Sequence, residues 1–184
     1  MHTIRTPRVN LRPIGAGDEA LYCHLYTDPQ VMRHIAAPLS AEAAQRAFRT
    51  AIGLTQQPSA TLVLWVLTER DSSIDIGILA LMRHATSADS AEVGTMLSAA
   101  GQGRGVAAEA QTALLDHLFS APGLRMVWSR NAVGNGAEGG VRRKLGFACA
   151  DDGQADVPVV RWEMTAELWR ARRGIVALMA QTSC

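Results

Sequence analysis

Two glycines, Gly103 and Gly105, lie between an apolar run at residues 92–98 and an alanine-rich helical pattern at residues 106–119. Glycine has no Cβ, so the chain can turn tightly there and a ligand can approach the backbone. The helix that follows would present unpaired N–H groups and the positive end of its dipole in its first turn. A strand, a glycine turn and a helix start together predict an anion cradle suited to the phosphates of a nucleotide cofactor.

Composition bounds the size and the partners of the protein. The chain has 184 residues, 48% of them hydrophobic, which is enough for one core, and no repeat or low-complexity linker divides it. We therefore expect a single domain over residues 1–184, in which residues 166–184 form a helical C-terminal extension. The 18 basic and 17 acidic side chains are intermixed and leave a net charge of +1, so charge gives no reason to expect direct nucleic-acid binding.

Nothing in the sequence predicts a membrane anchor, a disulfide framework or a metal centre. No apolar run approaches the roughly 18 residues of a membrane span, and the N-terminal segment lacks the apolar stretch of a signal peptide. The cysteines Cys23, Cys149 and Cys184 are odd in number and widely spaced, and the histidines lack metal-ligand spacing. We therefore expect a cytoplasmic protein without a membrane span or a bound metal.

Hydrophobic periodicity predicts a mixed α/β domain. We expect strands at residues 8–12, 61–67, 75–82, 92–98, 125–130, 147–150 and 157–165, and helices at 19–27, 41–54, 106–119, 141–145 and 166–184. Asp18 and Ser40 stand where they could cap the first two helices. Strands that follow one another through short loops in the middle of the chain indicate a largely antiparallel sheet.

Three nucleotide-binding motifs compete for the glycine turn. A P-loop is excluded, because the turn has no lysine followed by a hydroxyl residue. Residues 103–108 fit the dinucleotide pattern G-x-G-x-x-A, which requires a βαβ unit and an acidic residue about 20 positions later. The upstream strands read as antiparallel and the later region holds Trp128, Ser129 and Arg130 instead of an acid, although Arg130 could meet a 2′-phosphate. An NADPH-binding oxidoreductase therefore stays as an alternative.

The third motif extends over most of the chain. Residues 102–107, Gln-Gly-Arg-Gly-Val-Ala, resemble the Q/R-x-x-G-x-G/A pyrophosphate loop of the GCN5-related N-acetyltransferase (GNAT) superfamily. Asn135 and the Lys-Leu-Gly-Phe segment at 144–147 resemble the N-x-x-S…K-L-G-F segment of that superfamily. Residues 6–13, with Asp18 and residues 27–32, resemble the branch of RimJ/RimL-type ribosomal-protein N-terminal acetyltransferases. The resemblance spans roughly residues 5–165.

The resemblance implies a fold and a cosubstrate, acetyl-CoA. The family fold is a twisted, mostly antiparallel sheet of six to seven strands flanked by about four helices, and the strands at 92–98 and 125–130 would splay apart to admit the cosubstrate. The resemblance implies that backbone groups of Met96, Leu97 and Ser98 pair with the pantetheine arm. It also implies that the pyrophosphate is held by the amides of Gln102, Gly103, Arg104, Gly105, Val106 and Ala107. The Arg104 side chain would add charge, and Asn135 would reach the pantetheine or the phosphates, unless it only caps the next helix.

The implied reaction is direct transfer of acetyl to a primary amine, on a protein N-terminus or a small molecule, in a ternary complex. An ammonium is not a nucleophile, so a base must remove a proton. Glu92, expected at the start of its strand, is the candidate base, and an exposed strand-end carboxylate is the alternative interpretation. The N–H of Leu97 would stabilise the thioester oxygen as the amine attacks.

The chain departs from the family pattern at two catalytic positions. Arg142 stands where many members have a tyrosine, and Glu138 stands where the branch has a serine. Glu138 could act as an acid or through water as a base, or it could be a solvated helix residue. These departures favour a second hypothesis, a non-catalytic acyl-CoA-binding or sensor domain. The sequence does not identify the acceptor or distinguish a monomer from a homodimer.

Overall fold

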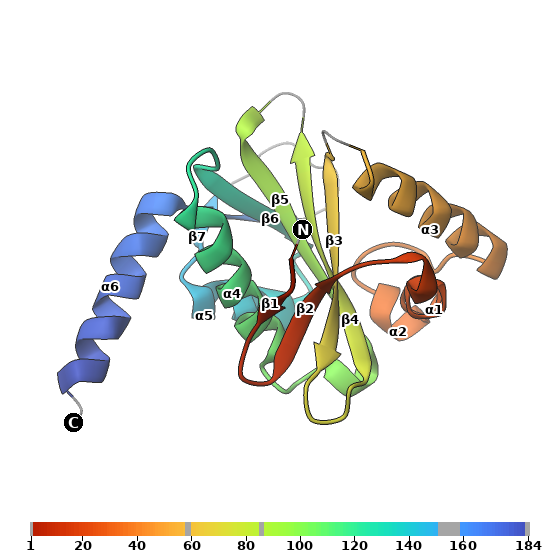
Figure 1. The fold of residues 1–184 in the computed structure, drawn as a ribbon, viewed down its shortest axis with the longest axis horizontal. Helices are drawn as coiled ribbons and strands as arrows, with labels where there is room; N and C mark the ends of the chain where they lie inside the picture. Colours follow the sequence, from red (N-terminus) through yellow and green to blue (C-terminus); the bar gives the residue numbers. More distant parts are fainter. Residues whose placement is uncertain (1, 58–59, 85–86, 151–158, 183–184) are drawn as a thin grey trace.

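The protein folds around one eight-stranded sheet with helices on both faces (Figure 1). The computed structural model describes residues 2–57, 60–84, 87–150 and 159–182. The strands in these residues are β1 (Ile4–Arg5), β2 (Val9–Pro13), β3 (Leu62–Glu69), β4 (Asp75–His84), β5 (Ser87–Leu97), β6 (Met126–Ala132), β7 (Ala148–Ala150) and β8 (Val159–Thr165). The α-helices are α1 (Glu19–Thr27), α2 (Pro29–Met32), α3 (Ala41–Thr55), α4 (Val106–Ser120), α5 (Gly136–Leu145) and α6 (Ala166–Thr182). The strand order is β1-β2-β3-β4-β5-β6-β8-β7, and only the β5–β6 pair is parallel.

Alternation along the strands divides the core into two layers. In β3, Trp65 and Leu67 pack in the layer with α4, whereas Leu64 and Val66 pack in the layer with α1 and α3. Figure 1 shows α1, α2 and α3 on one side of the sheet and α4, α5 and α6 on the other. Because both faces of β3 are covered, every position from residue 62 to 67 is apolar.

The predicted mixed α/β class and mostly antiparallel sheet are confirmed, with differences in the number and length of elements. The two-residue strand β1 and the one-turn helix α2 were not predicted, and α2 forms because Asp28 caps it and Pro29 occupies its first position. β5 begins at residue 87, five residues before the predicted start at 92. Its polar beginning is held by pairing, since Ser87 lies opposite His84 of β4 and Ser90 opposite Met126 of β6. Residues 157–158 of the last predicted strand lie outside the described residues.

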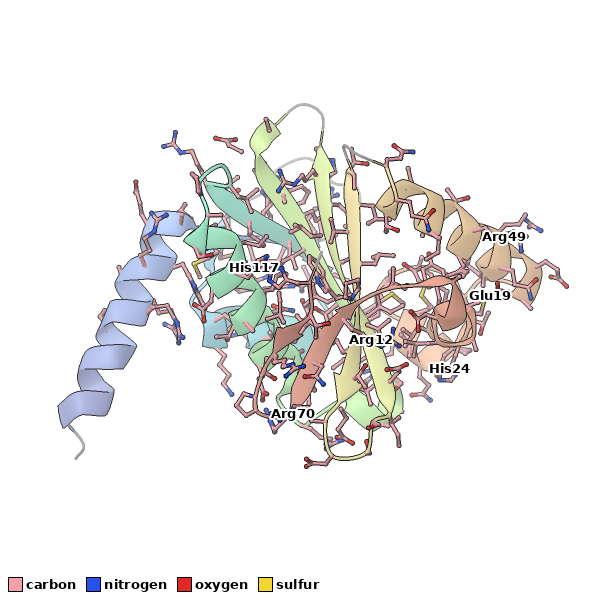
Figure 2. All side chains as sticks on the ribbon, viewed as in Figure 1. Arg12, Glu19, His24, Arg49, Arg70 and His117 are labelled. Carbon is pink, nitrogen blue, oxygen red and sulfur yellow. The ribbon has the colours of Figure 1, made fainter. Side chains whose placement is uncertain are left out.

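The cap of α1 and the start of α5 also differ from the prediction. The Asp18 carboxylate does not cap α1; it accepts hydrogen bonds from the Gly15 N–H at 2.7 Å and from Arg12, which is labelled in Figure 2. Burial acts to raise the pKa of Asp18, but these hydrogen bonds outweigh it and the pKa is lowered. α5 begins at residue 136 and not at 141, because Asn135 Oδ1 accepts the Glu138 N–H at 3.2 Å.

Candidate functional site

The sheet opens between its two parallel strands. β5 and β6 pair at three positions, Ser90 with Met126, Ala91 with Val127 and Glu92 with Trp128. Beyond Glu92, β5 continues to Leu97 paired with β4, and β6 continues to Ala132 paired with β8. The facing edges of β5 and β6 therefore separate and leave a V-shaped opening with Glu92 at its apex.

The backbone of Leu97 faces this opening. The Ser98 N–H donates to Ile76 O of β4 at 2.9 Å, and backbone groups along a strand alternate in direction, so the N–H and C=O of Leu97 point away from β4. The Leu97 C=O accepts a hydrogen bond from Gln102 Nε2 at 2.9 Å. By the same alternation the backbone of Met96 points toward β4. The Ser98 hydroxyl also donates to Ile76 O, at 3.2 Å, so Ser98 is turned away from the opening.

The glycine turn leads directly into α4 at the mouth of the opening. Gly103 and Gly105 have φ values of +71° and +74°, a left-handed backbone conformation that residues other than glycine rarely adopt. Gly105 is the N-cap residue, and its position carries no side-chain cap. The first N–H with a partner in the helix is that of Glu109, which donates to Gly105 O at 3.2 Å. The first turn of α4 therefore directs unpaired N–H groups outward.

A cavity of about 450 Å³ occupies the opening. It is lined by most of the residues that the sequence singled out, namely Met96, Leu97, Gln102, Gly103, Gly105, Val106, Ala107, Asn135 and Glu138. Thr95 of β5, Lys144 of α5, and His34 and Ile35 after α2 also contribute. Ser98, Arg104 and Glu92 do not line it. Residues from β5, the turn, α4 and α5 are thus brought together around one space.

Arg104 points away from the cavity. Its guanidinium pairs with Glu69 and donates to Ala100 O at 3.3 Å. Arg8 donates to the Arg104 carbonyl at 2.7 Å and is itself held by Glu109, whose Oε2 lies 2.5 Å from Arg8 Nε. Burial acts to raise the pKa of Glu109, but hydrogen bonds from Thr6 and Arg8 outweigh it and lower the pKa. Arg104 therefore stabilises the turn on the side that faces away from the cavity.

The cations that border the turn are Arg8 and Lys144. A second cavity of about 260 Å³ shares Gly105, Ala108 and Lys144 with the first. It is lined by Arg8 and by Arg172 and Arg173 of α6. Arg8 is paired with Glu109, which lines the same cavity, and Arg173 is paired with Asp116. Basic side chains therefore gather beside the glycine turn, which the sequence analysis did not predict because these residues are distant in sequence.

Glu92 lies in the middle of β5, and the prediction that it begins the strand was wrong. Its side chain is 14% exposed, with Oε2 at 3.4 Å from His84 Nε2 and 3.5 Å from Arg130 Nη2. It faces the same side of the sheet as Gly94 and Met96, which is the side of α1–α3. Glu92 therefore lies at the apex of the opening but on the opposite side of the sheet from α4.

Arg142 and Glu138 form an ion pair in the wall of the cavity. Arg142 is fully buried; its Nη1 donates to Gln111 Oε1 at 2.5 Å, and Gln111 Nε2 donates to Thr95 Oγ1 at 2.9 Å. Arg142 Nε has no partner, and the guanidinium lies 5.0 Å from the Phe147 ring centroid. Burial lowers the pKa of Arg142, opposed by Glu138, yet an arginine stays protonated at neutral pH. Glu138 is therefore the counter-ion of Arg142 and not a solvated helix residue.

Gln111 was missed by the sequence analysis. It lies 1% exposed inside α4, between β5 and Arg142. The available signal was the polar Gln111 next to the apolar stripe of the 106–119 pattern, because a buried side-chain amide needs a specific hydrogen-bond partner. Its chain of hydrogen bonds connects one wall of the opening to the other.

The described residues contain no group of three or more His, Cys, Asp or Glu side chains that could hold a metal ion. Of the helices that the structure describes, none combines the length and the apolar character needed to cross a membrane. Cys23 and Cys149 are free thiols, and burial raises the pKa of Cys23.

Comparisons with known proteins identify the family. The family model described as "Acetyltransferase (GNAT) domain" matches residues 8–148. Similar solved structures include an acetyltransferase from Agrobacterium tumefaciens str. C58, with 21% identity, a TM-score of 0.74, and coverage of 89% of this chain and 94% of that one. A GNAT-family acetyltransferase from Bacillus anthracis has 16% identity and a TM-score of 0.75, covering 90% of this chain and 99% of that one.

A structure of RimL, the ribosomal L7/L12 alpha-N-protein acetyltransferase, in complex with coenzyme A is 17% identical. Its TM-score is 0.75, and the match covers 90% of this chain and 99% of that one. At these identities the solved structures show the shared fold alone. A search of curated protein sequences finds no significant match. The family model covers most of the chain, including the glycine turn and both edges of the opening, and the chain therefore belongs to the GNAT acetyltransferase family.

Proposed function

We propose that the protein is an acetyl-CoA-dependent N-acetyltransferase that acts on a primary amine by direct attack in a ternary complex. The observation that carries this proposal is the opening between β5 and β6, with the uncapped first turn of α4 at its mouth. The family supplies acetyl transfer as the class of reaction. The RimL structure, which contains coenzyme A, supports the choice of acyl donor.

The residues around the opening fit such a donor. The unpaired N–H groups of Val106 and Ala107, with those of the glycine turn, would hold the pyrophosphate at the positive end of the α4 dipole. Lys144 would add charge there in place of Arg104, which is paired with Glu69. The free backbone edge of β5 at Leu97 would pair with the pantetheine arm. Asn135 would approach the same ligand through its amide nitrogen, because its oxygen caps α5.

Glu92 at the apex and the Leu97 N–H further along β5 would supply the chemistry. Glu92 would take a proton from the acceptor ammonium, directly or through water, and so free the nitrogen lone pair. As the new C–N bond forms, the Leu97 N–H would stabilise the negative charge on the thioester oxygen. The C–S bond then breaks and the sulfur leaves as a thiolate. A thiolate is a good leaving group at neutral pH, so the pairing of Glu138 with Arg142 is compatible with turnover.

One observation favours a second candidate, a non-catalytic acyl-CoA sensor. The family's tyrosine and serine positions hold the buried Arg142–Glu138 pair, and no described residue at these positions is a free proton donor. Such a domain would bind the same ligand and differ in turnover alone.

Ligand-dependent stability tests the binding half of the proposal. Coenzyme A at 100 times its dissociation constant should stabilise the fold by about 2.7 kcal/mol, which raises the melting temperature by roughly 5–10 °C in a domain of this size. NADPH should give no shift. Stabilisation by NADPH and not by coenzyme A would overturn the proposal.

Turnover and the base are tested by thiol release from acetyl-CoA with a panel of amines. Replacing the base, Glu92→Gln, should lower kcat roughly 100- to 10,000-fold while leaving coenzyme A binding intact. Glu19→Gln, in the first turn of α1 (Figure 2), is the matched control and should leave kcat unchanged. Binding without turnover on any amine would favour the sensor, and full activity of Glu92→Gln would remove Glu92 as the base.

A further inference from the structure

Two arginines lie directly opposite one another beside the apex of the opening. Arg130 of β6 is the register partner of Arg161 of β8. Both guanidiniums stack on Trp128, with the Cζ atom of Arg161 at 4.4 Å and that of Arg130 at 5.1 Å from the ring centroid. Trp128 is 8% exposed, so it forms a rigid floor under the two cations. We call Arg130 and Arg161 on this floor the arginine pair.

The arginine pair places two like charges directly opposite one another in an antiparallel pair of strands, where they repel. Stacking on Trp128 and the flanking carboxylates offset this repulsion. The Arg130 side chain is 49% exposed and that of Arg161 is 26% exposed. Both guanidiniums are thus partly accessible, and the planar fork of an arginine binds a carboxylate through two parallel N–H groups.

Each arginine has a flanking carboxylate that balances it in part. Arg161 Nε lies 2.8 Å from Glu163 Oε1. Arg130 Nη2 lies 3.5 Å from Glu92 Oε2, the atom that also lies 3.4 Å from His84 Nε2. His84 in turn stacks on Trp128, with ring centroids 5.4 Å apart. Glu163 thus balances Arg161, whereas the single carboxylate of Glu92 is shared between Arg130 and His84.

The arginine pair and the proposed base share one face of the sheet. Glu92 is the register partner of Trp128, and residues two apart on a strand point to the same side. Arg130 follows Trp128 by two residues, a step of roughly 7 Å along β6. A carboxylate bound by the arginine pair would thus lie within one small molecule's length of an amine at Glu92.

We propose that the acceptor amine carries a carboxylate a few bonds from its nitrogen, and that the arginine pair binds this carboxylate. The inference rests on the proposed acetyl transfer and names the class of acceptor. The acceptor carboxylate takes over Arg130 from Glu92, which leaves Glu92 to accept the proton of the ammonium. The same chemistry occurs in a free amino acid and in a peptide whose first residue is Asp or Glu.

Matched acceptors test the proposal by steady-state acetylation. L-phenylalanine is compared with L-phenylalaninamide for the free amino acid, and Asp-Ala-Ala with Asn-Ala-Ala, both C-terminally amidated, for the peptide, with rates expressed per unprotonated amine. The carboxylate-bearing member of at least one pair should have a kcat/KM roughly 10- to 100-fold higher, the range of a charged hydrogen-bond pair. The pair that shows the difference identifies the source.

Variants show whether the arginine pair is responsible. Arg161→Gln should lower kcat/KM for the carboxylate-bearing acceptor by a similar factor, leave the amide acceptor unchanged and so abolish the discrimination. Arg5→Gln, an exposed arginine of β1 at the other edge of the sheet, is the control and should change neither.

Equal kcat/KM values within both acceptor pairs would overturn the inference, as would an equal loss on both members in Arg161→Gln. In either case acetyl transfer itself would stand. Absence of transfer to every amine, with coenzyme A binding retained, would instead refute the proposed activity.

Discussion

Removing the charge of Glu138 should destabilise the protein more than removing both charges of the Glu138–Arg142 pair. Glu138→Gln leaves a guanidinium in a fully buried position without its counter-ion. Breaking a buried pair in this way costs about 3–5 kcal/mol, and because the Glu138 side chain is 19% exposed we expect the lower end, about 3 kcal/mol.

The double variant Glu138→Gln/Arg142→Met should recover part of this loss. Methionine has an unbranched stem of similar length, so the buried charge disappears while much of the volume is kept. Gln111 Oε1 loses its donor, which costs about 1–2 kcal/mol. The second substitution should therefore restore about 1–2 kcal/mol of the free energy of unfolding.

Urea unfolding followed by circular dichroism measures these differences. At an m value of about 2 kcal/mol/M, Glu138→Gln should lower the urea midpoint by roughly 1.5 M, and the double variant by roughly half as much. Glu163→Gln breaks a pair whose side chains are 26% and 31% exposed, and it should cost less than about 1 kcal/mol. A double variant less stable than Glu138→Gln would refute the argument that the uncompensated buried cation dominates.

Two further predictions concern the glycine turn and the first helix. Because φ is +74° at Gly105, Gly105→Ala should lower the free energy of unfolding by about 1–2 kcal/mol and also lower the affinity for coenzyme A measured by calorimetry. Gly53→Ala, in the exposed interior of α3, should instead raise the free energy of unfolding by about 0.5–1 kcal/mol. Unchanged stability of Gly105→Ala would contradict the strain assigned to a side chain at this position. Because the pKa of Asp18 is lowered in the folded state, its pairing with Arg12 stabilises the fold at pH values above the unfolded-state pKa of about 3.9, and this stabilisation is lost as the pH falls through the lower folded-state pKa. The difference in free energy of unfolding between wild type and Asp18→Asn, measured by urea unfolding, should therefore shrink in acid. A difference that stays constant with pH would contradict this linkage.

The sequence was sufficient to predict elements whose periodicity agrees with their burial. The 106–119 pattern became α4, and the apolar residues at 61–67 became a strand buried on both faces. The polar start of β5 and the glycine-containing start of α5 were not predictable in this way. In both cases partners supply the stability: strand pairing at Ser87 and Ser90, and the cap from Asn135.

The nucleotide turn was predictable because its constraint is local. Two glycines just before a helical pattern can be read directly from the sequence, and in the structure Gly103 and Gly105 adopt the left-handed conformation. Backbone groups along a strand alternate in direction, so neighbouring residues differ: the backbone of Leu97 faces the opening, whereas Ser98 is turned away from it. The direction of the Arg104 side chain depends on Glu69, 35 residues away, which no local pattern reports.

The dinucleotide alternative shows how far local reasoning reaches. The prediction that the strands upstream of the turn are antiparallel is confirmed for β3, β4 and β5, but β5, α4 and β6 form a parallel crossover. The geometry that a dinucleotide site needs is thus present locally. The family model, which covers the same turn, removes the oxidoreductase interpretation.

The short contact between β5 and β6 divides the sheet into two groups of strands. The antiparallel group from β1 to β5 and the group of β6, β7 and β8 are joined across the sheet by three register pairs ending at Glu92 and Trp128. A molecule in the cavity would contact β5 of the first group and α5, which directly follows β6, and would so bridge the two groups. Substrate occupancy and the mechanical coherence of the sheet are therefore linked, and amide exchange along the free edges of β5 and β6 would report the two together.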